Sequence, residues 1–193
     1  MAFIHDTTMS PTKVELLTRW LPKQSWYAGD GTPQLTRVGG FRLDDPEGEV
    51  GIEFMLVHDD AGRGGTTYQV PMTYRGSPLP SAEDALIGTG QHGVLGERWI
   101  YDGVRDPTLV AELVALLQGR SEPQHQSLSD TPEPRVRVDR TEPSPSGTTE
   151  TIAGPDGVVI HLVRVLTTTV LAHFEGPDGQ GAIVMAETPP EAR

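Results

Sequence analysis

Three segments of the chain alternate apolar and polar residues with the period of two that is typical of a half-buried strand. The alternation runs over residues 35–43, 50–58 and 66–74, and acidic, glycine-containing loops separate the three segments. Short connections of this kind predict an antiparallel meander. Pro71 has no backbone N–H to donate, so we expect the third strand to lie at an edge of the sheet or to bend there.

A helix is predicted on each side of this meander in the sequence. The first is expected to begin with Ser10 as the cap and Pro11 in the first turn, and to end at Pro22. The second is expected to begin at Asp106 and to end at Gly119. Its apolar stripe is broad enough that it must pack, and we expect it to cross the concave side of the meander.

The composition changes after the second helix. Residues 121–148 are rich in Pro and Ser and predict a mostly extended linker, with a strand near residues 135–138. A β-branched run then lies between two Gly-Pro-Asp-Gly turns at residues 154–157 and 176–179. We therefore divide the chain into an α+β domain over residues 1–120, a linker over 121–148 and an antiparallel β-hairpin segment over 149–193, which can pack on the same domain.

Charge and composition narrow the function classes. The 193 residues include 15 Lys and Arg against 27 Asp and Glu, a formal net charge of −12. Nucleic acids and anionic membranes are bound by clustered basic residues, so we expect neither as a partner. The sequence has no Cys, no run of 18 apolar residues and no signal-peptide pattern at its start, which favours a cytoplasmic protein.

The chemistry-bearing motifs are weak. Gly88, Gly90 and Gly93 fit G-x-G-x-x-G and are a phosphate-loop candidate, but we expect a flexible glycine turn because a strand does not precede them. The two lysines, Lys13 and Lys23, both precede the motif, so no phosphate-binding lysine follows it. No metal site, cofactor or catalytic residue is assigned, and we expect the chain not to be an enzyme.

Histidines and aromatic residues leave alternatives open. His161 and His173 fall in predicted strands, where they can meet across a hairpin. Trp20, Trp26 and Tyr27 cluster in one short segment. Flat aromatic faces suit sugar rings, but large aromatic residues more often fill the core, and we expect the core role here.

The aromatic segment carries a family resemblance. Its sequence, Trp20-Leu21-Pro22-Lys23-Gln24-Ser25-Trp26-Tyr27-Ala28-Gly29, resembles W-L-x-x-Q-R-W-Y-A-G, the opening of the N-terminal cap domain of maltokinases. Residues 68–75 and 99–107 are also similar to cap sequences in order and spacing. The family's Arg is Ser25 here. The resemblance implies an α+β fold in which a few helices pack on a curved antiparallel sheet, as in cystatins.

Elsewhere this sequence departs from the pattern of the family. Residues 157–164 resemble the strand that carries the family's nucleotide-binding lysine, but His161 stands at that position. The kinase C-terminal lobe has no counterpart in the sequence. The resemblance therefore implies a stand-alone, cap-like protein.

Three functions follow from these observations. The first is a non-catalytic interaction or regulatory module of α-glucan (glycogen) or trehalose metabolism, with a sugar kinase or a trehalose or glucan enzyme as its partner. The second is a degenerate kinase-like protein that binds nucleotide or phosphorylates a sugar, the only case that needs ATP and Mg²⁺. The third is a sugar- or small-molecule-binding protein that uses the concave face of its sheet. The candidate contact residues are Trp20, Trp26, Tyr27, Tyr74, Arg75 and Trp99.

Overall fold

Three long strands form the core of the first sheet. The computed structural model describes residues 9–61, 64–140, 147–177 and 179–185. Strands β2 (Leu35–Asp44), β3 (Gly51–Asp59) and β4 (Thr66–Arg75) pair in antiparallel order and confirm the predicted meander. Their bounds lie within one residue of the predicted ones. The alternation succeeds here because each strand is bounded by a turn that its own residues specify.

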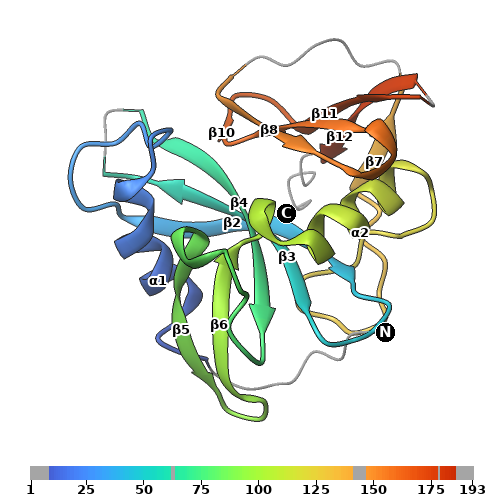
Figure 1. Cartoon of the computed structure of the whole chain (residues 1–193). Coiled ribbons are helices and arrows are strands. Elements are labelled where there is room, and N and C mark those ends of the chain that lie inside the picture. The colour runs from blue at the N-terminus through green and yellow to red at the C-terminus, as the bar shows by residue number, and fades with distance from the viewer. Residues whose placement is uncertain (1–8, 62–63, 141–146, 178, 186–193) are drawn as a thin grey trace, which may run out of the picture.

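Four further strands extend this sheet. They are β1 (Met9–Ser10), β5 (Leu86–His92), β6 (Gly96–Asp102) and β10 (Val165–Leu166). The order is β1-β5-β6-β4-β3-β2, and β10 pairs with β4 off this path. The sheet curls into a half-barrel (Figure 1), which confirms the expected curved antiparallel α+β fold.

The C-terminal strands build a second antiparallel sheet. It contains β7 (Val136–Asp139), β8 (Thr149–Ala153), β9 (Val159–Val163), β11 (Val170–Gly176) and β12 (Gly179–Met185), in the order β7-β12-β11-β9-β8. A short 3₁₀ helix, η4 (Pro155–Gly157), makes the first Gly-Pro-Asp-Gly turn. His161 and His173 lie opposite each other on β9 and β11, as predicted.

The segment after the second helix includes a strand, as expected. β7 lies within residues 121–148, and Gln124 further pairs with Arg42 of β2 through two backbone hydrogen bonds. The segment therefore follows the edge of the first sheet before it enters the second. The division of the chain into units at residues 120 and 148 stays a prediction.

The two α-helices are short. α1 (Lys13–Trp20) runs directly into the 3₁₀ helix η1 (Leu21–Lys23), whereas α2 (Pro107–Leu117) follows the 3₁₀ helix η3 (Gly103–Arg105). A third 3₁₀ turn, η2 (Glu83–Ala85), precedes β5. Among the described residues, no helix has the length and apolarity that a membrane crossing requires.

The first helix begins two residues later than predicted. Thr12, not Ser10, is the cap: its hydroxyl accepts the N–H of Glu15, and the Glu15 carboxylate accepts the N–H of Thr12. This reciprocal capping box satisfies two backbone donors and outcompetes Ser10 as the start. Ser10 instead pairs with Gln91 in the β1–β5 ladder.

The central strands β3 and β4 of the first sheet are covered on both faces, each by a different layer. On one face, α1 packs with Met55, Val57, Tyr68 and Val70. On the other face, α2 and the second sheet share one core with β2 and β3 (Figure 1). That core includes Phe41, Phe54, Leu109, Leu113, Ile160 and Leu171. The stripe of α2 thus covers the meander as predicted, and the second sheet completes the layer.

The expectation that Pro71 places the third strand at an edge is wrong, because β4 lies inside the sheet between β3 and β6. Backbone N–H groups alternate sides along a strand, and the N–H of Gln69 points away from β3 to Arg164 O at 3.0 Å. The nitrogen of Pro71 therefore also faces away from β3. On that side β10 pairs as far as Tyr68 and β6 begins at Met72, so the missing donor falls in a gap between two partner strands.

Gln69 joins the two sheets through its side chain. The amide is fully buried, and its Nε2 donates to Val163 O at 3.2 Å and to Leu171 O at 3.0 Å. Those carbonyls belong to β9 and β11 of the second sheet. One side chain of the first sheet therefore satisfies backbone acceptors of two strands in the second.

We expect Gln69→Leu to lower the free energy of unfolding by about 2 kcal/mol, since two buried carbonyls lose their donor while one amide oxygen without a partner is removed. Chemical denaturation measures the change. The matched control is Gln91→Leu at an exposed position of β5, where we expect less than about 0.5 kcal/mol. Equal losses in the two variants would contradict the bridging role of Gln69.

Candidate functional site

Arg164 occupies the point where the chain passes from one sheet to the other. It is the single residue between β9 of the second sheet and β10 of the first, and its side chain is fully buried. Its Nη2 donates to Asp102 Oδ2 at 2.7 Å and to Glu150 Oε2 at 2.6 Å. Its Nε donates to the same Glu150 oxygen at 2.9 Å. A buried guanidinium held by carboxylates from both sheets ties β6 to β8.

The ring of Trp26 completes the surroundings of this guanidinium. Arg164 Cζ lies 4.9 Å from the ring centroid, within the range of a cation–π contact. Nη1 of Arg164 has no hydrogen-bond partner among the described residues. The ring of Trp26, in the segment that follows α1, therefore lies against the cation of Arg164 at the boundary between the two sheets.

The carboxylate of Asp102 is electrostatically unusual. Burial raises its pKa, and the nearby Glu150 carboxylate raises it further, while the charge and hydrogen bond of Arg164 act in the opposite direction. Asp102 therefore holds a proton more tightly than an ordinary Asp, despite its ion pair.

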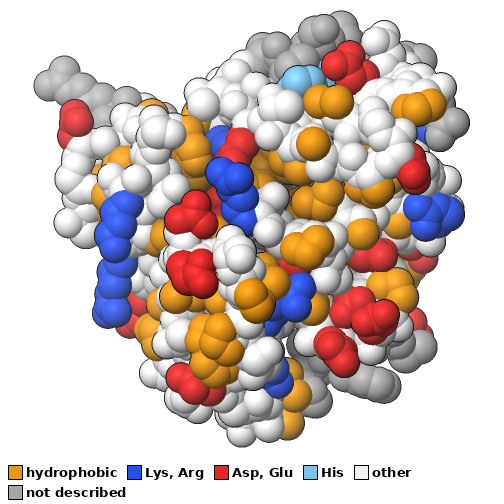
Figure 2. Space-filling view, in the orientation of Figure 1, with side chains coloured by type: hydrophobic (Ala, Val, Ile, Leu, Met, Phe, Trp, Pro, Cys, Tyr) orange, Lys and Arg blue, Asp and Glu red, His pale blue; other side chains and the backbone are white. Residues whose placement is uncertain are grey.

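A pocket of about 460 Å³ lies directly beside this cluster. One part of its lining comes from the end of α1, from the segment after η1, and from η2 and η3: Trp20, Gln24, Ser25, Trp26, Asp84 and Arg105. Asp102 and the start of the second sheet, residues 148–150, close the opposite wall. On this face of the molecule, basic, acidic and hydrophobic side chains meet near the boundary between the sheets (Figure 2).

Trp20 and Trp26 were expected either to fill the core or to offer a stacking surface, and the structure shows features of both roles. Trp20 is 5% exposed and packs in the core under α1, whereas Trp26 is half-buried. Their rings meet edge to face, with centroids 5.7 Å apart. Both residues nevertheless line the pocket. They therefore stabilise the fold and also present aromatic surface to whatever enters it.

The hydroxyl groups of Tyr27 and Tyr74 donate hydrogen bonds to carboxylates within the protein. Tyr27 donates to Asp59 Oδ2 at 3.0 Å, and burial together with this carboxylate raises the pKa of Tyr27 to about 12. Tyr74 donates to Glu53 Oε2 at 2.7 Å, and burial beside this carboxylate raises the pKa of Tyr74 well above its ordinary value. The structure thus places these candidate residues in two buried carboxylate clusters, away from the pocket lining.

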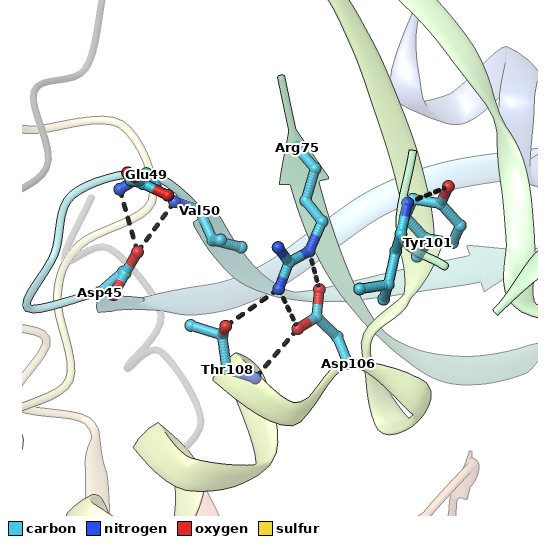
Figure 3. Close-up of polar contacts among 8 residues, drawn as sticks. Asp45, Glu49, Val50, Arg75, Tyr101, Asp106 and Thr108 are labelled. Atoms are coloured by element: carbon cyan, nitrogen blue, oxygen red, sulfur yellow. Dashed lines mark hydrogen bonds and ion pairs between the residues drawn. The ribbon is translucent and has the colours of Figure 1, made fainter. Parts of the chain in front are cut away.

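Arg75 anchors the second helix (Figure 3). Its Nε and Nη2 donate to the two oxygens of Asp106 at 2.7 and 2.6 Å, and Nη2 also donates to Thr108 Oγ1 at 3.0 Å. Asp106 is the predicted cap of α2 and accepts the N–H of Thr108. The hydrogen bonds of the guanidinium and of that N–H hold the pKa of Asp106 below its usual range, although burial opposes them. This bidentate pair fixes the position of α2.

Trp99 and the glycine motif also lie outside the pocket lining. Trp99 packs beside a small cluster of Ala82, Ala85 and Tyr101. Gly88 and Gly90 lie within strand β5 and not in the turn that we expected, whereas Gly93 does lie in the turn between β5 and β6. A Cβ at Gly88 would lie 2.8 Å from Leu16 Cδ2, so the small residue lets α1 approach the strand.

Sequence reasoning missed most of the polar residues of the site. Asp84, Asp102, Arg105 and Glu150 were not named as candidate site residues, although Asp102 and Arg105 lie within residues 99–107. Arg164 carried one signal: it is a single charged residue after a run of apolar positions that the second sheet buries. Nothing local in the sequence connects it with Asp102, 62 residues away.

The described residues also form a second cavity, which lies apart from this pocket. It has a volume of about 410 Å³ and lies between the first sheet and the β10–β11 connection, lined by Val38, Leu56, Leu166, Leu171, Met185 and neighbouring threonines. Within the described ranges, no three His, Asp or Glu side chains are grouped so that they could hold a metal ion.

The fold defines an α+β protein built on a curled antiparallel sheet, with a junction pocket where a second sheet joins it. Residues 20–106 match the family model of the maltokinase N-terminal cap domain, rather less than half of the chain. The match supports the resemblance of this part of the chain to that family. No curated protein matches the chain.

The Tyr27–Asp59 hydrogen bond makes a prediction for alkaline pH. A raised pKa in the folded state means that stability is complete below the unfolded value of 10 and is lost as the pH rises through about 12. We expect the unfolding free energy to fall more steeply between pH 10 and 12 in the unmodified protein than in Tyr27→Phe. Asp59 keeps the N–H groups of Gln34 and Ala61 in that variant, so the fold survives. Denaturation at several pH values measures both slopes, and equal slopes would exclude the internal hydrogen bond.

Proposed function

We propose that the chain is a non-catalytic interaction module of α-glucan or trehalose metabolism. Its partner is an enzyme of that metabolism, either a sugar kinase or a trehalose- or glucan-converting enzyme. The family match over residues 20–106 carries the proposal, since the matched region includes the whole β2–β4 meander and the aromatic segment.

The environment of His161 supports a role without phosphoryl transfer. His161 stands where the resemblance places the nucleotide-binding lysine of the family. Its Nδ1 lies 3.1 Å from Thr151 Oγ1, and its Nε2 lies 3.9 Å from Glu175 Oε1. A permanently charged lysine normally binds the phosphates, and an imidazole placed between a hydroxyl and a carboxylate is a poor substitute.

The turn between β5 and β6 supplies a candidate contact surface. Val94 and Leu95 are 61% and 47% exposed, and both lie at the tip of this hairpin. The Nδ1 of His92 accepts their backbone N–H groups at 3.3 and 3.1 Å, and Arg98 donates to Leu95 O at 3.0 Å. A turn fixed in this way presents two aliphatic side chains at little entropic cost, which favours binding.

Binding to purified maltokinase and to purified trehalose synthase tests the proposal by isothermal titration calorimetry. We expect one of the two enzymes to bind, and the double variant Val94→Asp, Leu95→Asp to weaken that binding at least tenfold, because a charge would be buried without a partner. Leu128→Asp, at another exposed aliphatic position, is the matched control and should bind normally. Lack of binding to both enzymes would contradict the proposal.

A phosphorylation assay tests the non-catalytic role separately. With ATP, Mg²⁺ and maltose, glucose or glucosamine, we expect no sugar phosphate above a protein-free blank. Reproducible sugar phosphate that is lost in His161→Ala would favour the degenerate-kinase alternative instead.

A further inference from the structure

The junction pocket has the size and construction of a small-molecule site. Its volume of about 460 Å³ lies within the range of ligand pockets and is large enough for one or two hexose-sized rings. Its walls come from both sheets, with residues 20–26 on one side and residues 148–150 on the other. A molecule bound here would contact both layers at once.

The charges around the pocket come close to balance. Asp84, Asp102 and Glu150 line it, and they face Arg105 in the lining and Arg164 directly behind it. Arg164 is shared between Asp102 and Glu150, so this buried group keeps a negative charge when both carboxylates are ionised, and Asp84 and Arg105 are exposed charges of opposite sign. A phosphate would meet the carboxylates and a polyamine would meet the guanidinium groups. An uncharged ligand avoids both of these like-charge repulsions.

The remaining groups recognise hydroxyls and an apolar ring face. Gln24, Ser25, Thr148 and Thr149 offer amide and hydroxyl groups that both donate and accept hydrogen bonds. Trp26 presents its half-buried indole to the pocket while Arg164 holds the ring. The C–H face of a sugar ring packs on such an indole, and its hydroxyls reach carboxylates and guanidinium groups at the rim.

From this arrangement we propose that the junction pocket binds a neutral saccharide of one or two rings. Trp26 is the stacking residue, and Arg105, Asp84 and Gln24 are the hydrogen-bonding residues of the rim. This places a sugar site at the boundary of the two sheets and not on the concave face of the first sheet, which α2 and the second sheet cover. The proposal concerns this chain alone, so it stands or falls independently of any partner enzyme.

Isothermal titration calorimetry of the whole chain tests the site with glucose and maltose as probes, and with inorganic phosphate and spermidine as charged comparators. We expect glucose or maltose to bind with a stoichiometry of one, and neither charged comparator to compete with it. Arg105→Ala should weaken the binding about tenfold, since it removes a charged hydrogen-bond donor from the rim. Arg37→Ala, at an exposed position of β2 outside the pocket, is the matched control and should leave the affinity unchanged.

Ser25→Trp provides a second test, because Ser25 is exposed and a large side chain there fills the pocket with little effect on the core. We expect this variant to lose saccharide binding. Backbone amide hydrogen exchange locates the ligand without any substitution: added maltose should slow exchange at residues 24–26 and 149–150 together. No binding of either sugar, equal affinity in Ser25→Trp, or competition by phosphate would each overturn the proposal.

Discussion

The burial of one guanidinium group governs how this chain is assembled. Removing Arg164 from water costs several kcal/mol, which only well-placed carboxylates and hydrogen bonds offset. Asp102 arrives at the end of β6 and Glu150 in β8, so the cost is met only when the two sheets lie in their observed positions. The same contacts bring Trp26 over the cation and create the wall of the junction pocket.

The packing of the two sheets also limits where a partner can bind the region that matches the cap family. Strands β3 and β4 of the matched region have no exposed residue, because α1 covers one side and α2 with the second sheet covers the other. Gln69 and Arg164 both join the two sheets. Gln69 donates hydrogen bonds to backbone carbonyls, and Arg164 donates to a carboxylate side chain. The faces of β3 and β4 are therefore closed to a partner, which leaves edges, hairpins and the junction pocket for contacts.

The parts that the sequence predicted well are those that local chemistry decides. The limits of β2, β3 and β4 follow from alternation and turn residues, and the start of α2 follows from Asp106 and Pro107. Pro71 was assigned to an edge because its missing donor is visible in the sequence, while the gap between β10 and β6 is not. The glycine motif misled for the same reason, since the approach of Leu16 to Gly88 depends on tertiary packing. The site was half predicted: Trp20 and Trp26 were named, but Arg164 and Asp102 meet only through the topology.

Backbone hydrogen exchange in Arg164→Met, compared with Arg37→Met at an exposed position, tests most directly whether the buried guanidinium joins the two sheets. Its removal leaves a buried carboxylate without its cation, so the free energy of unfolding should fall by about 3–5 kcal/mol. Protection of amides in β8 and β9 should be lost before that of β3. A loss below about 1 kcal/mol, with unchanged protection in β8 and β9, would contradict the account.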